Sequence, residues 1–336
     1  MTMTKSKIMI LAAAFALAAC DPASPGLITV DTGGCNLHVN CSFGATKAVG
    51  QTEAIENTIN NMSVFVFRKD PGHKLDASAF SDGGETELQL RCTVGDKIIY
   101  VLANSASDFT GRVRCEDDLL SLSSSLTENG LSNLFMMGRT EQMLAEPTCS
   151  MSVPVVRPVA SVRVEKITNL MEANGYRADN LFTVNAIYLT NVVGTWAFNG
   201  TTDPQNLGES GWLARLEKQV NPLICDEGIN AVVNYGNAMN VAHTFYAFPN
   251  PCGLKEESAW SPRSTMLVVE ATLDGVKYYY PVAVGPLESN RQYVINDFII
   301  RRPGSNHPWE VVHKTDVTID VEVVPWSEAS NVNEDI

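Results

Sequence analysis

The stretch MLVVEATLDGVKYYYPVAV, residues 266–284, decides the fold class of this chain. Two runs rich in aliphatic, β-branched and aromatic residues flank the pair Asp274-Gly275. Asp-Gly between two such runs is typical of a two-residue type I′ turn, in which both central residues take positive φ. The stretch therefore predicts an antiparallel β-hairpin formed by residues 266–273 and 276–284.

Short segments of the same character recur along the chain. Further strands are expected at residues 63–67, 87–94, 98–102, 153–167 with a break at Pro158, 181–189, 244–248, 293–300 and 317–323. One helix is expected at residues 116–126, where an acidic first turn precedes leucines at helical spacing. Many short strands and little helix are typical of β-sandwiches, so we predict a mostly β protein.

Length indicates the number of domains, and net charge indicates which partners are unfavourable. A chain of 336 residues is too long for one ordinary β-sandwich and suits two domains of about 150 residues each. We place the boundary near residue 165, with an N-terminal domain at 35–165 and a C-terminal domain at 166–336. The net charge of −14 argues against binding to nucleic-acid phosphates.

The start of the chain has the pattern of an export signal. Lys5 and Lys7 precede an uncharged apolar run at residues 8–19, and the small residues 17–19 lead directly to Cys20. The run is shorter than the about 20 residues that cross a bilayer, so it predicts a secretory signal. Small residues before a cysteine are typical of a bacterial lipoprotein signal, with lipid attached to Cys20. The alternative is an ordinary signal peptide with a chance cysteine.

Residues 1–19 are thus the predicted signal peptide, and residues 20–34, rich in proline, glycine and small polar residues, are a predicted tether. Export would place the chain outside the cytosol. Whether its cysteines pair depends on that location, because disulfides form in oxidising surroundings. Seven cysteines besides Cys20 either pair there in part or stay as buried thiols. They are Cys35, Cys41, Cys92, Cys115, Cys149, Cys225 and Cys252.

A search for catalytic and metal-binding motifs finds no H-E-x-x-H pair, G-x-S-x-G elbow or phosphate loop. We therefore predict no catalytic residue, metal or cofactor, with a hydrolase of dispersed site as a remote alternative. Asp316, Asp320 and Glu322 are interpreted as a solvated strand face, because no glycine-centred calcium loop accompanies them. Residues 278–280, three tyrosines, are interpreted as packing residues rather than a sugar platform.

Several segments occur in the order found in a known family. They are residues 60–67 (NNMSVFVF), 97–104 (KIIYVLAN), 135–138 (FMMG), 153–162 (VPVVRPVASV), 244–250 (TFYAFPN), 279–282 (YYPV), 288–293 (ESNRQY), 300–308 (IRRPGSNHP) and 323–326 (VVPW). With the lipoprotein leader before them, they resemble the fimbrillins, or type V pilins, of Bacteroidales bacteria. The ordered set extends over nearly the whole chain.

The resemblance implies two tandem transthyretin-like β-sandwich domains and a structural, non-enzymatic role in cell-surface fimbriae. Family subunits are exported as outer-membrane lipoproteins, and a trypsin-like protease then cuts after a basic residue and removes the first strand. In this chain that implies a first strand at residues 35–43 and cleavage between Lys47 and Ala48. Lys47 is the only basic residue between Cys20 and Arg68, and the best-known members have arginine at this position.

The resemblance also implies how subunits join. A strand from the next subunit fills the vacated groove and pairs with its free backbone groups. Head-to-tail addition of this kind does not close, so it gives a filament. The donor would be the chain end beyond about Asp316 or the tail at residues 327–336, which is polar apart from Ala329, Val332 and Ile336.

The implied partners are other fimbrial subunits, the outer membrane through lipid on Cys20, and a host or bacterial surface ligand. Nucleic acid is not expected. One alternative is an uncut, lipid-anchored anchor or accessory subunit. Another is a carbohydrate-binding surface lipoprotein that uses exposed aromatic residues such as Trp212 and Trp260.

Overall fold

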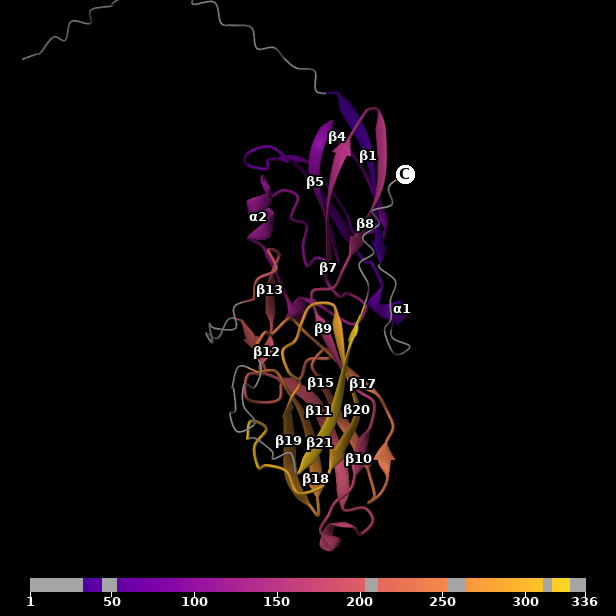
Figure 1. The fold of residues 1–336 in the computed structure, drawn as a ribbon, viewed down its shortest axis with the longest axis vertical. Helices are drawn as coiled ribbons and strands as arrows, with labels where there is room; N and C mark the ends of the chain where they lie inside the picture. The colour runs from indigo at the N-terminus through magenta and orange to yellow at the C-terminus, as the bar shows by residue number, and fades with distance from the viewer. Residues whose placement is uncertain (1–32, 44–52, 203–210, 253–263, 311–315, 327–336) are drawn as a thin grey trace, which may run out of the picture. The chain divides into compact units, whose positions relative to one another are not determined.

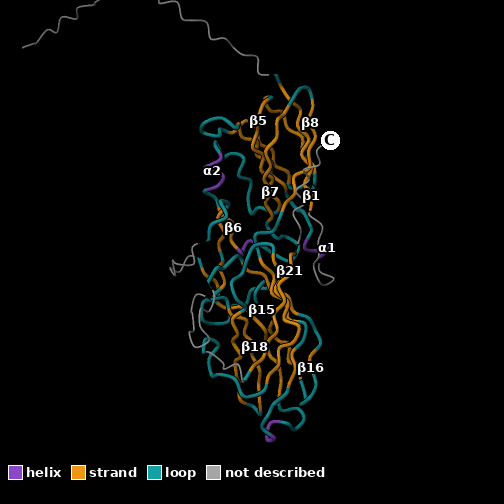
Figure 2. The backbone as a smooth tube through the Cα atoms, viewed as in Figure 1, coloured by secondary structure: helices purple, strands orange, loops and turns teal. Residues whose placement is uncertain are grey.

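The computed structural model describes residues 33–43, 53–202, 211–252, 264–310 and 316–326. These residues cluster as one compact unit. Strands make up 54% and helices 5%, which confirms the prediction of a mostly β protein. Figure 2 shows that strands run through most of the described backbone and that the helices are short. Among the described residues, no helix is long and apolar enough to cross a membrane.

The elements of the first half, in chain order, are β1 (Gly34–Phe43), α1 (Glu53–Glu56), β2 (Met62–Arg68), β3 (Leu75–Ser81), β4 (Glu87–Thr93), β5 (Gly95–Ala103), α2 (Glu116–Leu120), β6 (Ser123–Ser125), the 3-10 helix η1 (Leu126–Glu128), β7 (Met136–Leu144) and β8 (Thr148–Val155). Those of the second half are β9 (Ala160–Val164), β10 (Ile167–Asn169), the 3-10 helix η2 (Asn174–Tyr176), β11 (Phe182–Thr190), β12 (Val192–Val193), β13 (Thr195–Ala197), β14 (Trp212–Leu213), β15 (Cys225–Val232), β16 (Ala238–Met239), β17 (His243–Ala247), β18 (Met266–Leu273), β19 (Val276–Ala283), β20 (Arg291–Ile300) and β21 (Val317–Pro325).

Two sheets from the first half of the chain pack on each other (Figure 1). One has the strand order β4-β1-β8, and the other has the order β3-β2-β5-β7. Their facing side chains form one core, to which β1, β2 and β5 contribute Leu37, Val39, Val64, Val66, Ile99 and Val101. The first six residues of β2 are buried, as expected for a strand that is apolar on both faces.

The second half forms another pair of sheets. One has the order β16-β10-β20-β9-β17 with β21 also paired to β20, and the other has the order β15-β11-β18-β19. The predicted hairpin is confirmed as β18 and β19, and its turn residues Asp274 and Gly275 take φ values of 48° and 77°. The expected break at Pro158 is also confirmed. The chain passes from the first pair of sheets to the second between Val155 and Ala160, a few residues before the predicted boundary near residue 165.

The predicted helix at 116–126 is wrong in its second half. Helix α2 has the expected acidic first turn but ends at Leu120, with Ser121 as its C-cap. Three serines follow as strand β6, which pairs with β13. Serine hydrogen-bonds readily to nearby backbone and is a weak helix former, so the pairing with a distant strand outweighs the leucine spacing.

Strand β21 shows the predicted alternation only at its beginning. Val317 is buried, Ile319 and Val321 are half-buried, and Thr318, Asp320 and Glu322 are exposed. Strict alternation from Val317 predicts that Val323 also lies on the inner face, but its exposed fraction is 51%. The partner strand β20 has a register shift between Ile295 and Asp297, opposite Val321 and Asp320 and shortly before the alternation ends. Such a bulge increases local twist and changes which side chains reach the core.

Gly138 lies where β7 crosses close to β8. A Cβ atom built on Gly138 would lie 2.3 Å from the carbonyl oxygen of Pro154 and 3.0 Å from Cγ1 of Val153. The nearest atom belongs to the backbone, so it cannot move aside as a flexible side chain can. The glycine of the 135–138 segment is therefore required by the close approach of two sheets.

We expect Gly138→Ala to lower the free energy of unfolding by about 1–3 kcal/mol, as overpacking of a filled core does. Gly130→Ala is the matched control, because no atom lies within 4 Å of the Cβ built there. That control should stay within about 0.5 kcal/mol of the wild type. Urea unfolding of both variants measures the difference, and equal midpoints would contradict the steric argument.

Candidate functional site

Strand β1 is the central strand of its sheet (Figure 1). It pairs antiparallel with β4, where Gly34 faces Thr93 and Asn40 faces Glu87. It pairs parallel with β8 along residues 36–43. Because β1 satisfies the backbone groups of both neighbours, its removal would leave two facing strand edges with unpaired N–H and C=O groups. The first strand predicted at residues 35–43 corresponds to β1.

The inner face of β1 fills four consecutive positions of the core. Cys35, Leu37 and Val39 are completely buried, and the exposed fraction of Cys41 is 6%. Burial of one aliphatic side chain of this size stabilises a fold by about 1.5–3 kcal/mol. The space that β1 occupies is thus a long apolar groove with pockets at every second residue. A replacement strand needs apolar residues at the same period of two.

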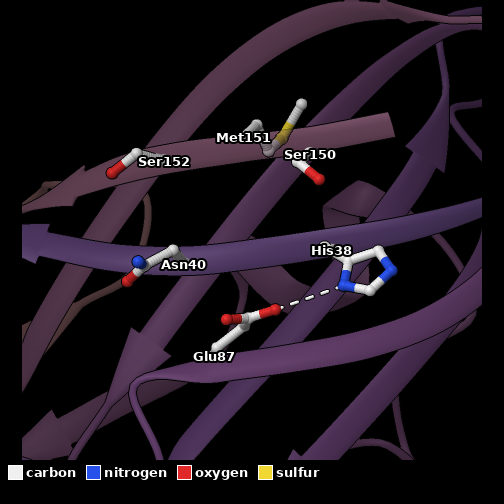
Figure 3. Close-up of a pocket in the computed structure, with 6 residues that line it drawn as sticks. All are labelled: His38, Asn40, Glu87, Ser150, Met151 and Ser152. Carbon is white, nitrogen blue, oxygen red and sulfur yellow. Dashed lines mark hydrogen bonds and ion pairs between the residues drawn. The ribbon is translucent and has the colours of Figure 1, made fainter. Parts of the chain in front are cut away.

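The outer face of β1 carries an open polar pocket (Figure 3). His38 and Asn40 come from β1, Glu87 from β4, and residues 150–152 from β8. Glu87 points toward His38, and Nδ1 of His38 lies 3.2 Å from Oε1 of Glu87. Among the described residues, no group of three histidine, cysteine, aspartate or glutamate side chains is placed to hold a metal ion. The dashed line in Figure 3 marks this pair, which links β1 to β4 across the pocket.

The predicted modification sites flank β1 in sequence. Cys20, the predicted lipid site, and the predicted cleavage position at Lys47 and Ala48 lie outside the described residues. Helix α1 is the next element after β1, so the chain runs from β1 to the rest of the fold through the segment that contains Lys47. A cut in that segment would leave β1 attached to the fold by noncovalent contacts alone.

A buried polar cluster joins the element after this segment to the end of the described chain. The carboxylate of Glu56, whose exposed fraction is 3%, accepts hydrogen bonds from the hydroxyl of Tyr246 at 2.5 Å and from Nε1 of Trp326 at 3.2 Å. The rings of Tyr246 and Trp326 stack with centroids 5.7 Å apart. Cζ of Arg157 lies 4.8 Å from the centroid of the Trp326 ring, close enough for a cation–π contact.

The cluster fixes Trp326, the residue directly before the predicted donor tail. Burial, and secondly the nearby Glu56 carboxylate, raises the pKa of Tyr246 far above its ordinary value, so its hydroxyl stays protonated and donates. Sequence reasoning missed this cluster. Arg157, Tyr246 and Trp326 all lie in family segments, but nothing in those segments indicates that the three side chains meet.

Other sequence-based expectations have clear outcomes. The seven described cysteines are free thiols in the structure; Cys35, Cys41, Cys92 and Cys225 are buried, and Cys115, Cys149 and Cys252 are half-buried. Tyr280 is completely buried, which agrees with its interpretation as a packing residue. Trp212 was considered as an exposed sugar-binding aromatic, and this is wrong because its exposed fraction is 9% and it belongs to the core. Trp260 lies outside the described residues.

Comparisons with known proteins address the family directly. The family model described as "Major fimbrial subunit protein (FimA)" matches residues 36–153, which contain most of β1 and all of β4. A search of curated protein sequences finds no match. Among solved structures, 48 chains match.

A candidate cell adhesion protein from Bacteroides eggerthii aligns with a TM-score of 0.64 at 19% identity, covering 88% of this chain and 96% of its own. A fimbrilin (FimA) from Porphyromonas gingivalis aligns with a TM-score of 0.58 at 18% identity, covering 87% and 98%. The tip fimbrial protein Mfa3 from Porphyromonas gingivalis, with a C-terminal truncation, aligns with a TM-score of 0.51 at 13% identity, covering 87% and 100%. At these identities, the structures establish a shared fold. The family match in the N-terminal part of the chain, together with this fold, confirms the resemblance to a fimbrillin-type family.

Proposed function

We propose that this protein is a structural subunit of cell-surface fimbriae that assembles with other fimbrial subunits by strand exchange. The observation that carries the proposal is the central position of β1 in the sheet β4-β1-β8. A fold that loses this strand gains an apolar groove bordered by two unpaired strand edges. Such a groove is completed by an extended segment from another chain, as in other cases of β-strand addition.

The proposed maturation follows the order of the segments along the chain. The protein is exported, receives lipid on Cys20 and reaches the outer membrane. A protease then cuts between Lys47 and Ala48, and the fragment that contains β1 leaves. The family match and the fold shared with fimbrial subunits support this sequence of events, which requires no enzymatic activity of the protein itself.

The proposed donor is the chain end beyond Asp316. Within the described residues, β21 pairs only with β20, so it is an edge strand. Val317, Ile319 and Val321 alternate with polar residues, which matches the period of the groove that β1 fills. The tail at 327–336 has three apolar residues, and a strand would place Ala329 on the opposite face from Val332 and Ile336.

Limited trypsin treatment of the purified protein tests the proposal. Cut wild-type protein should give a ladder of multimers on a denaturing gel run without boiling. Lys47→Ala should lose the ladder, whereas Lys74→Ala, which removes another exposed lysine, should keep it. Deletion of residues 327–336 assigns the donor: loss of the ladder would place it in the tail, and a retained ladder in β21. Cut wild-type protein that stays monomeric at high concentration would refute strand exchange.

One alternative within the same class has support in the sequence. The lysine at position 47, where the best-known members have arginine, and the polar tail both favour an anchor or accessory subunit that is never cut. The N-terminus of the protein recovered from cell surfaces separates the two roles. A start at Ala48 indicates a polymerising subunit, and lipidated Cys20 on the whole population indicates the anchor.

A further inference from the structure

The groove that β1 fills has a defined size at each of its four inner positions. Leu37 is the largest of the four buried side chains, Val39 is the next, and the cysteines at positions 35 and 41 are the smallest. Apolar exchanges that conserve volume are tolerated best, whereas voids and overpacking are both destabilising. A replacement strand therefore needs a leucine-sized residue at the position of Leu37 and a valine-sized residue at the position of Val39.

Strand β21 offers this order of sizes. One face of the strand carries, at every second position, Val317, Ile319, Val321 and Val323. Ile319 matches the position of Leu37 when β21 runs in the direction of β1. Val321 then replaces Val39, and valines replace the cysteines at both ends. A shift by two residues would place a valine in the leucine position and Ile319 in a smaller one, so β21 matches the groove in one register in this direction.

The inner positions also distinguish the two directions in which β21 could enter. Because β1 pairs antiparallel with β4 and parallel with β8, either direction gives one ladder of each kind, and the backbone has no strong preference. In the opposite direction, Ile319 at the leucine position would bring Thr315 to the position of Cys41. Its hydroxyl would then be buried where the first direction places the apolar Val323. The side chains therefore favour the direction of β1.

The outer edge of the groove carries a carboxylate that β1 matches with neutral partners. Asn40 lies directly opposite Glu87 in the pairing of β1 with β4. Nδ1 of His38 lies 3.2 Å from Oε1 of the same glutamate (Figure 3). On the other side of β1, strand β8 presents Ser150 and Ser152 at this level. Strand β1 thus offers Glu87 an amide and an imidazole, and no carboxylate.

Strand β21 places acidic residues at the same two positions. In the register that seats its aliphatic residues, Glu322 takes the position of Asn40 and Asp320 takes the position of His38. Glu322 then lies directly opposite Glu87, with Asp320 as a diagonal neighbour. Like charges directly opposite each other destabilise a strand pair. The inner face of β21 therefore suits the groove, and its outer face does not.

We propose that Glu87 is a specificity-determining residue of the groove, which favours β1 and disfavours β21 of a second copy of this chain. The inference rests on the proposed function, because it requires a groove that accepts β21. Assembly of this chain with itself is weakened by the contact between Glu87 and Glu322. A donor strand with the same apolar order and a neutral or basic residue at the position of Asn40 binds more tightly, so a subunit with such a strand is the preferred partner.

A double-mutant cycle with a peptide tests the contact. Protein cut after Lys47 and separated from its β1 fragment is titrated into a fluorescent peptide of residues 316–326, and binding is followed by anisotropy. Glu87→Gln should bind the peptide about 1.4- to 5-fold more tightly than the wild type. Glu322→Gln in the peptide should give a similar gain with the wild type and little further gain with Glu87→Gln. Asp117→Asn, which removes an exposed carboxylate from α2, is the control and should bind as the wild type does.

Each outcome of the titration decides one step. Equal affinities of the wild type and Glu87→Gln would overturn the role of Glu87. Full and independent gains from Glu87→Gln and Glu322→Gln would overturn the register, because residues that do not meet contribute additively. In both cases the peptide still binds, and strand exchange stands. A peptide that binds none of the cut proteins would instead refute β21 as the donor of the proposed function, and the inference with it.

Zero-length cross-linking tests the direction of β21. Glu87→Lys is cut after Lys47, allowed to assemble and treated with a water-soluble carbodiimide, which joins an amine to a carboxylate in contact with it. After digestion with trypsin, the new lysine should be joined to Glu322 in peptide 315–336, and uncut protein should give no such product. The opposite direction with Ile319 at the leucine position would place Asp316 at this point, so a cross-link to Asp316 in place of Glu322 would overturn the register.

Discussion

Replacing Lys97 with methionine is expected to lower the free energy of unfolding by about 3 kcal/mol, because it leaves a buried carboxylate without its closest cation. Nζ of Lys97 lies 2.9 Å from Oδ2 of Asp76, and the exposed fractions of the two side chains are 3% and 2%. Methionine keeps the length of the lysine stem and removes only the charge. The loss stays near the lower end for a broken buried pair, because Nε of Arg68 remains 3.2 Å from Asp76.

The pH dependence gives this prediction a second readout. Burial alone raises the pKa of Asp76, but hydrogen bonds from Lys97 and Thr93 outweigh burial and lower the pKa below its ordinary value of 3.8. A carboxyl whose pKa is lower in the folded state stabilises the fold above the unfolded pKa, and this contribution is lost as the pH falls through the folded pKa. The gap between wild type and Lys97→Met should therefore be full at pH 7 and shrink below about pH 4.

Urea unfolding at the two pH values measures the gap. The double variant Asp76→Asn, Lys97→Met serves as the control, because it removes both charges and should recover part of the loss. A single variant within about 0.5 kcal/mol of the wild type at pH 7 would show that the pair does not hold β3 to β5.

The strands could be predicted because their signals are local. Alternation and β-branched runs indicated β2, β5, β11, β18, β19 and β20, and Asp274-Gly275 fixed the register of one hairpin. Helix 116–126 failed where a nonlocal contact decided the outcome, since β6 pairs with β13 some seventy residues later in the chain. A local window contains no information about such a partner.

The candidate site was accessible to sequence reasoning only in part. The resemblance placed the first strand at 35–43, and the structure gives β1 as Gly34–Phe43. Its neighbours could not be derived, because the sequence of a strand indicates burial and not which strands lie beside it. The Glu56 cluster could not be derived for the same reason, because it joins residues far apart in the chain through the fold alone.

The family segments nevertheless contain structural requirements that explain single residues. Gly304 in the 300–308 segment has no room for a side chain, since a Cβ atom there would lie 2.3 Å from the carbonyl oxygen of Tyr279. Gly138 is restricted in the same way by Pro154. At both positions the backbone of another segment lies too close for a side chain, so glycine is required there.

Asn104, the last residue of the segment KIIYVLAN, supports the remaining large prediction. Its φ of 59° is in the left-handed region, where asparagine is tolerated better than most residues. Its side chain is buried, donating to the carbonyl oxygens of Thr58 at 2.8 Å and Leu134 at 2.9 Å. Its Oδ1 accepts a hydrogen bond from the backbone N–H of Asn60 at 2.8 Å. One side chain thus satisfies three backbone groups from two separate loops.

We therefore expect Asn104→Ala to lower the free energy of unfolding by about 3 kcal/mol, from left-handed strain of about 1 kcal/mol and the loss of partners for three largely buried backbone groups. Asn180→Ala isolates the strain, because Asn180 is exposed and has a φ of 62°. Asn104→Gly isolates the hydrogen bonds, because glycine takes positive φ freely. Urea unfolding of the three variants should rank Asn104→Ala as the least stable, followed by Asn104→Gly and then Asn180→Ala. If Asn104→Ala and Asn180→Ala lose the same stability, the three hydrogen bonds contribute nothing, and the Ala-Asn ending is a matter of backbone conformation alone.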